Sequence, residues 1–140
     1  MIFVLLGIAI VYVLAISWLI YGFTKVPVYT KKEVTPKTRF SILVPFRDEA
    51  ENLPILLESI AKLKYPTNLF EVLLIDDASE EKFQIPNSKF QITLTNSIRQ
   101  SNSPKKDAIT TGVPLANNEW IVTTDADCIV PENWLLTLDD

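Results

Sequence analysis

Acidic residues follow three of the four apolar segments in this sequence that could form β-strands. They are Asp48 and Glu49 after the first segment, Asp76 and Asp77 after the second, and Asp125 and Asp127 after the fourth. Carboxylates that share one crevice repel one another and raise one another's pKa values unless cations neutralise them. Mg²⁺ and Mn²⁺ take carboxylate oxygens as ligands and commonly join them to substrate phosphates. If the three pairs meet, the pattern predicts a divalent-cation site for a phosphate-bearing ligand.

The spacing of the acids predicts which of them share a face. Asp125 and Asp127 are two residues apart, so in extended backbone their side chains leave the same face, with Cα atoms about 6.6–7 Å apart. That separation is within reach of one ion. Asp76 and Asp77 are adjacent, so they point in opposite directions. At most one of these two faces the ligand, and the other is free to cap a turn or a helix.

Each acidic pair also has a purely structural interpretation. Aspartates are common in turns after strands because their side chains bond the nearby backbone. Asp48 and Glu49 could favour a helix N-terminus through the helix dipole. Lys105 could face a phosphate, although a solvated lysine is the ordinary case. The coincidence of acids at three strand ends, rather than any single pair, favours a binding site.

Four apolar segments alternate with helical patterns over residues 40–138. Strands are predicted at 40–44, 70–75, 90–94 and 120–124, with Pro45 ending the first, and helices at 51–63, 104–116 and 131–138. This alternation predicts an α/β fold with a parallel sheet covered on both faces. In such sheets, ligands bind at the carboxyl ends of the strands, where the acids stand. Trp120 and Trp134 are expected in the core, and Cys128 is expected to be reduced and partly buried.

The first 23 residues carry no charge. A helix over residues 2–23 would be about 33 Å long, enough to cross the hydrocarbon core of a bilayer. Five basic residues and one acid follow in residues 25–39, and the positive-inside rule keeps such a flank in the cytoplasm. An uncleaved anchor in the inner (cytoplasmic) membrane, with a cytoplasmic domain, is preferred to a signal peptide, whose basic residues would precede the apolar run.

These features divide the 140-residue chain into a membrane anchor at 1–23, a juxtamembrane linker at 24–38 and one domain at 39–140. The chain has no histidine, which excludes histidine metal ligands and histidine general bases within this stretch. Its single cysteine excludes a disulfide scaffold. The lipid bilayer is an expected partner, and nucleic acid is not.

Five segments carry a combination of motifs in one order. They are SILVPFRDEAENLPILLESI at 41–60, YP at 65–66, FEVLLIDDAS at 70–79, KKDAITTG at 105–112 and WIVTTDADC at 120–128. Together they resemble glycosyltransferase family 2, and most of all its membrane-anchored bacterial members. The resemblance implies the nucleotide-diphospho-sugar transferase fold called GT-A, with a Rossmann-like half that binds the donor. Asp48 stands where the family more often has asparagine, and residues 80–102 match it only loosely.

The resemblance implies a role for each residue that matches the family's motifs. The nucleotide-sugar-binding residues it implies are Pro45, Arg47, Glu49, Asp77, Lys105 and Asp125. Asp77 would accept a hydrogen bond from the base, and Lys105 would lie near the nucleotide or its phosphates. Asp127, together with Asp125, would bind the divalent metal, Mn²⁺ or Mg²⁺, that bridges the diphosphate.

The resemblance also implies a reaction: transfer of a sugar from a UDP- or GDP-type donor to a lipid- or polysaccharide-linked acceptor of the cell envelope. Such enzymes invert the anomeric configuration and use an aspartate base, here expected beyond Asp140. The chain is therefore expected to be an amino-terminal fragment that is inactive alone. Two other functions remain open. A receiver-like signalling module would bind Mg²⁺ without nucleotide, and an anchored scaffold whose acids only cap turns would bind neither.

Overall fold

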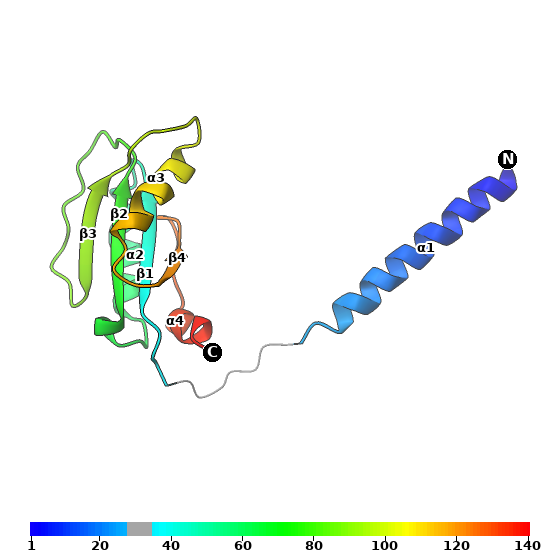
Figure 1. Cartoon of the computed structure of the whole chain (residues 1–140), viewed down its shortest axis with the longest axis horizontal. Coiled ribbons are helices and arrows are strands. Elements are labelled where there is room, and N and C mark those ends of the chain that lie inside the picture. The colour runs from blue at the N-terminus through cyan, green and yellow to red at the C-terminus, as the bar shows by residue number, and fades with distance from the viewer. Residues whose placement is uncertain (28–34) are drawn as a thin grey trace. The chain divides into compact units, whose positions relative to one another are not determined.

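A computed structural model describes residues 1–27 and 35–140 (Figure 1). The chain divides into two compact units, Met1–Lys31 and Lys32–Asp140. Part of the predicted linker, residues 28–34, lies outside the described residues.

The first unit is a single helix, α1 (Ile2–Thr24), which covers the predicted helical segment. Its side chains are exposed along its whole length. Within the described ranges, α1 is the one helix long and apolar enough to cross a membrane. Lys25 follows directly, and its ammonium lies 5.1 Å from the centre of the Tyr21 ring.

The second unit is built on a four-stranded sheet with the order β3-β2-β1-β4. The strands are β1 (Phe40–Phe46), β2 (Phe70–Asp76), β3 (Gln91–Asn96) and β4 (Trp120–Thr123). Every neighbouring pair is parallel, which confirms the predicted parallel sheet. All four carboxyl ends therefore meet at one edge of the sheet.

β1 runs through Pro45 to Phe46, farther than the predicted strand end. The carbonyl of Leu43 accepts a hydrogen bond from the N–H of Thr124. The backbone N–H and C=O groups of Leu43 therefore point toward β4, and the backbone of Pro45, two residues later, points the same way. Because β4 pairs with β1 only as far as Leu43, the missing N–H of Pro45 costs no hydrogen bond between the strands.

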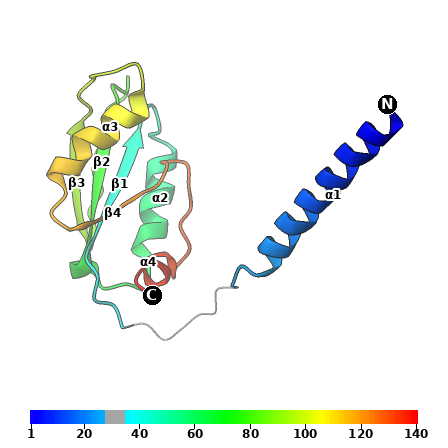
Figure 2. The ribbon, with the colours of Figure 1, turned by 45° about the vertical axis from the view of Figure 1, so that its right-hand side comes forward.

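The two faces of the sheet carry different helices (Figure 2). The helices of this unit are α2 (Asn52–Ala61), α3 (Pro104–Gly112) and α4 (Trp134–Leu138), with short 3₁₀ turns at Thr67–Leu69 and Val113–Leu115. On one face, Ile42, Val44 and Val72 pack with the apolar side of α2 and with Leu135 of α4. On the other face, Leu43, Leu73 and Ile75 pack with Ala108 of α3. This alternation along the strands confirms that both faces are covered.

Gly112 lets the end of α3 lie close against the sheet. A Cβ atom at this position would stand 2.9 Å from Cδ1 of Ile75 and 3.0 Å from Cδ2 of Leu43. Both contacts are shorter than carbon atoms tolerate without displacement. The absence of a side chain at Gly112 therefore allows the close packing of α3 against the sheet. This packing also affects the position of the pocket-lining residues at the other end of α3.

Two predictions about single residues are wrong. Trp120 is predicted to lie in the core, but 61% of it is exposed, because β4 is an edge strand that pairs only with β1 among the described strands. Cys128 was expected to be partly buried, and it is exposed. Trp134, in contrast, packs partly buried against the core on the α2 face.

The buried carboxylate of Asp139, directly after α4, is bonded to the segment that precedes β1. Oδ2 of Asp139 accepts hydrogen bonds from the N–H of Lys37 (2.9 Å) and the hydroxyl of Tyr65 (2.9 Å). Burial raises the pKa of Asp139, but hydrogen bonds from Thr38, Lys37 and Tyr65 outweigh it and lower the pKa overall. Burial and the Asp139 carboxylate raise the pKa of Tyr65. Asp139 is thus committed to this structural contact.

We expect Tyr65→Phe to lower the free energy of unfolding by about 1–2 kcal/mol, because it removes a donor from a buried carboxylate. The lowered pKa means that Asp139 contributes stability above its unfolded pKa of about 3.9 and loses it as the pH falls. The loss in Tyr65→Phe should therefore be largest at neutral pH and shrink on acidification. Urea unfolding at pH 7 and pH 3 measures both effects, with Tyr12→Phe as the control, and equal losses at the two pH values would contradict the assignment.

Candidate functional site

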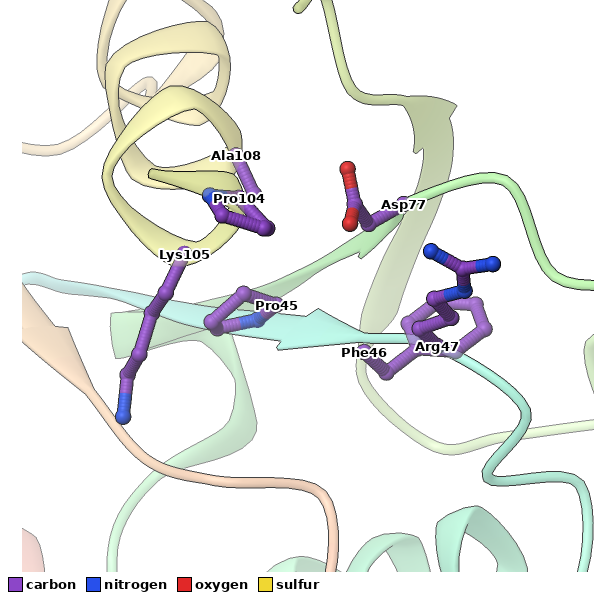
Figure 3. A pocket seen from close by; sticks show the side chains of 7 residues that line it. All are labelled: Pro45, Phe46, Arg47, Asp77, Pro104, Lys105 and Ala108. Carbon is purple, nitrogen blue, oxygen red and sulfur yellow. The ribbon is translucent and has the colours of Figure 1, made fainter. Parts of the chain in front are cut away.

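A pocket of about 160 Å³ lies at the carboxyl ends of β1 and β2, beside the first turn of α3 (Figure 3). Its lining residues are Pro45, Phe46, Arg47, Asp77, Pro104, Lys105 and Ala108. Four of the six predicted nucleotide-sugar-binding residues are among them: Pro45, Arg47, Asp77 and Lys105. These four come from three segments far apart in the sequence, which the parallel sheet and α3 bring to one place.

The adjacent acids at the end of β2 point into different surroundings, as their spacing predicts. Asp77 is buried and lines the pocket. Oδ1 of Asp76 instead accepts hydrogen bonds from the N–H (2.9 Å) and the hydroxyl (2.6 Å) of Ser79. Asp76 therefore closes the turn after β2, and Asp77 is the acid available to a ligand in this pocket.

Arg99 binds the pocket acid Asp77 but is absent from the predicted site residues, as are the lining residues Phe46, Pro104 and Ala108. Its guanidinium grips Asp77 with two hydrogen bonds, Nε to Oδ1 at 2.7 Å and Nη2 to Oδ2 at 2.6 Å. Paired N–H···O bonds of this kind are strong and directional. Arg99 lies 22 residues after Asp77, in the segment that matches the family motifs only loosely, and no local pattern links the two. The contact depends on where β3 ends relative to β2.

Lys105 joins the pocket to the predicted metal-binding acids. Its ammonium donates to Oδ1 of Asp125 at 2.5 Å, and the Lys105 side chain points away from Asp77 in Figure 3. The hydrogen bond and charge of Asp125 raise the pKa of Lys105. A single cation therefore connects the end of β4 with the first turn of α3.

Asp125 and Asp127 lie in a turn rather than in extended backbone. β4 ends at Thr123, and the N–H of Cys128 donates to the carbonyl of Asp125 at 3.3 Å. The expectation that the two side chains leave one face of a strand is therefore wrong, because the chain bends as soon as its pairing with β1 ends. Both residues are exposed at the carboxyl edge of the sheet.

Glu49 lies outside the residues that line the pocket. Its carboxylate accepts a hydrogen bond from the side-chain amide of Asn52 at 2.6 Å, and its carbonyl accepts the N–H groups of Asn52 and Leu53. These contacts begin α2. The structure thus gives Glu49 a structural role, and leaves its predicted contact with the nucleotide without support from the pocket.

The loops after β1 and β2 are tied to each other through Asp48. Its N–H donates to Oγ of Ser79 at 2.9 Å, and its Oδ1 accepts the N–H of Glu80 at 2.8 Å. Asp48 has a φ of 55°, a left-handed conformation that asparagine and aspartate tolerate better than other side chains. This explains why aspartate is acceptable where the family more often has asparagine.

We expect Asp48→Ala to destabilise the domain by about 1–2 kcal/mol, because alanine pays the full cost of the left-handed conformation and loses the bond to Glu80. Asp48→Asn keeps both features, and its change should stay within about 0.5 kcal/mol. Chemical denaturation of the two variants measures the difference. Equal destabilisation would mean that the negative charge, and not the backbone conformation, matters here.

Asp125 and Asp127 are the two predicted metal ligands at this edge, and Oδ1 of Asp125 accepts a hydrogen bond from the ammonium of Lys105. Across residues 1–27 and 35–140, no group of three or more histidine, cysteine, aspartate or glutamate side chains could hold a metal ion. Both donors are exposed hard oxygens, which suit Mg²⁺ or Mn²⁺ when phosphate oxygens and water supply the other ligands. The residues present therefore fit a cation shared with a ligand, and not a closed protein site.

Residues 41–138 match the model of glycosyl transferase family 2. The chain belongs to this family. Relatives include an undecaprenyl-phosphate 4-deoxy-4-formamido-L-arabinose transferase from Photorhabdus laumondii, 32% identical over 98 residues, covering 64% of this chain and 29% of the relative. A beta-monoglucosyldiacylglycerol synthase from Nostoc sp. is 29% identical over 116 residues, covering 79% and 25%. This chain thus spans less than a third of the length of these two relatives.

Solved structures share the fold. The mannosyltransferase PcManGT from Pyrobaculum calidifontis, in complex with GDP-Man and Mn²⁺, superposes with a TM-score of 0.65 at 23% identity, covering 89% of this chain and 37% of that one. TarS 1–349 from S. aureus gives a TM-score of 0.60 at 22% identity, covering 72% and 31%. Together with the parallel sheet and its flanking helices, these likenesses identify the GT-A fold of family 2.

Proposed function

We propose that this chain is the donor-binding part of a membrane-bound glycosyltransferase that uses a nucleoside-diphosphate sugar of the UDP or GDP type. The observation that carries the proposal is the pocket that gathers Pro45, Arg47, Asp77 and Lys105 at the carboxyl edge of the sheet. Membership of glycosyl transferase family 2 supports sugar transfer. The similar structures support a nucleotide-sugar donor: PcManGT is in complex with GDP-Man, and TarS 1–349 is in complex with UDP or with UDP-GlcNAc.

In this proposal, Asp77 accepts a hydrogen bond from the nucleotide base. Arg99 holds both oxygens of Asp77 in place, and each carboxylate oxygen keeps a second lone pair for the ligand. Pro45 and Arg47 form the wall beside the base. Lys105 supplies a positive charge for the diphosphate, which would compete with Asp125 for the ammonium.

Asp127 and Asp125 would hold Mn²⁺ or Mg²⁺ together with the diphosphate. When bound, such a cation offsets the negative charge that develops on a departing nucleoside diphosphate. Lys105 would contribute to the same charge stabilisation from the first turn of α3. Glu49 belongs to the proposed donor site only as a residue of the loop that follows Arg47.

For the whole protein, we propose an inverting displacement at the anomeric carbon, with a general base outside these 140 residues. Asp139 is unsuited to that role, since its carboxylate is buried and accepts hydrogen bonds from Lys37 and Tyr65. A lipid-linked acceptor is favoured by the names of two relatives, the undecaprenyl-phosphate 4-deoxy-4-formamido-L-arabinose transferase and the beta-monoglucosyldiacylglycerol synthase. A polysaccharide-linked acceptor would serve the same chemistry.

We further propose that residues 1–23 anchor the protein in the cytoplasmic membrane, that 24–38 act as a linker and that the domain at 39–140 lies in the cytoplasm. The length and apolar character of α1 support the anchor. The five basic residues in 25–39 support the orientation, by the positive-inside rule.

Asp127→Ala should abolish Mn²⁺-dependent binding of UDP or GDP, because it removes one of two protein ligands of the cation, and should leave the fold intact. Titration calorimetry with and without Mn²⁺ measures the affinity, and circular dichroism checks the fold. Glu119→Ala removes an exposed acid at the opposite edge of the sheet and should bind like the wild type. Unchanged affinity in Asp127→Ala would reject the site, whereas Mn²⁺ binding by the wild type without nucleotide would favour the receiver-like module.

Cys128 allows the orientation to be tested, because it is the one cysteine in the chain and is exposed. In spheroplasts of a bacterial host, a membrane-impermeant maleimide should leave the protein unlabelled, and should label it after the membrane is opened. Cys128→Ser gives the background signal. Labelling of intact spheroplasts would place the domain outside and overturn the proposed orientation.

A further inference from the structure

The segment that carries Arg99 is held by hydrogen bonds at nearly every position. Between β3 and α3, the N–H of Ser97 donates to the carbonyl of Asp76 at 2.7 Å. The N–H of Ile98 donates to Oγ1 of Thr111 at 2.9 Å. The backbone just before Arg99 is therefore fixed by hydrogen bonds to β2 on one side and to α3 on the other, although the loop lies at the surface.

The carboxylate of Asp107 organises the second half of this loop. Its Oδ2 accepts the N–H groups of Gln100 (3.0 Å) and Ser101 (2.8 Å), and its Oδ1 accepts the hydroxyl of Ser101 (2.8 Å). Only 4% of Asp107 is exposed. The hydrogen bond from the N–H of Ser101 is the largest influence on the pKa of Asp107 and lowers it, so the group is ionised at neutral pH.

Asp107 and Thr111 act from one side of α3. They are four residues apart in a helix that runs from Pro104 to Gly112, so they lie on the same face, one turn apart. The hydroxyl of Thr111 also donates to the carbonyl of Asp107 at 2.8 Å. The residues on either side of Arg99, Ile98 and Gln100, are thus bound to the same face of the same helix.

This arrangement fixes one wall of the donor pocket. An arginine on a free loop would lose much side-chain and backbone entropy in binding a carboxylate at one position. Here the loop is already ordered, so the guanidinium reaches Asp77 at little further cost. α3 therefore contributes to the pocket twice, directly through Lys105 and indirectly through the loop that Asp107 holds.

We propose that Asp107 is a positioning residue for nucleoside-diphosphate binding, acting through the loop of residues 97–103 to hold Arg99 against Asp77. The inference rests on the proposed function of the pocket. It gives a role to Asp107, two residues after Lys105, which is not among the residues that the resemblance assigns to the donor site.

The test is a double-mutant cycle on UDP and GDP affinity, measured by titration calorimetry with Mn²⁺ on the full chain. Asp107→Ala should weaken binding about tenfold, the usual scale for loss of a coupled polar contact. Arg99→Gln should weaken it by a similar factor. If Asp107 acts through Arg99, adding Asp107→Ala to Arg99→Gln should change the affinity by less than about twofold.

Glu71→Gln is the matched control. Glu71 is also a buried carboxylate, 3% exposed, and accepts hydrogen bonds from Ser41 and Asn117 near the opposite edge of the sheet. It should lower the melting temperature without changing nucleotide affinity. Thr111→Val removes the hydroxyl that accepts the N–H of Ile98 in the same loop. This variant replaces Asp107→Ala in the test if Asp107→Ala does not fold. It should weaken binding in the wild type but not in Arg99→Gln.

The outcomes separate the two proposals. If the wild-type chain binds neither nucleotide, the proposed function is wrong and this inference falls with it. If the wild type binds and Asp107→Ala and Thr111→Val keep its affinity, the positioning role alone is overturned. Additive losses in the double variants would also overturn it, because they would mean that Asp107 does not act through Arg99.

Discussion

The parallel pairing of β1 with β2 on one side and with β4 on the other is the constraint on which the candidate site depends. Phe46 stands opposite Asp76, and Leu43 stands opposite Thr123. This register brings Arg47, Asp77 and Asp125 to the same edge, although they lie up to 78 positions apart in the sequence. A shift of either strand by one residue would exchange its two faces and turn the buried side chains outward.

Charge compensation is the second feature of this edge. Arg99 is paired with Asp77, and Lys105 is paired with Asp125, which reduces the repulsion between these two acids and their acidic neighbours. Asp77 is buried and its partner is held by an ordered loop, whereas Asp125 and Lys105 are exposed. The first pair is therefore suited to shaping a wall. The second is suited to opening when a phosphate and a cation arrive, because exposed ion pairs are weak.

The fold was predictable because its signals are local. Apolar runs of β-rich residues located all four strands to within two residues of their observed ends, and helical spacing located α2 and α3. The predicted end of β1 at Pro45 was wrong, because a proline ends a strand only where its N–H is needed for pairing. Here β4 pairs with β1 only as far as Leu43, so no N–H is needed at Pro45. Trp120 misled the prediction because a large apolar side chain on an edge strand has no second sheet neighbour to cover it.

Residue types and order along the chain were sufficient to select the family, the parallel sheet and four of the residues that line the pocket. The family and these residues follow from short motifs, and the sheet follows from the alternation of apolar segments with helical patterns. Tertiary structure alone decided that Arg99 binds Asp77, that Asp107 holds the loop of Arg99 and that Lys105 reaches Asp125. The physical reason is that hydrogen bonds of side chains form between whatever groups packing brings within about 3 Å. Nothing in the local sequence encodes the distance between segments that are far apart along the chain.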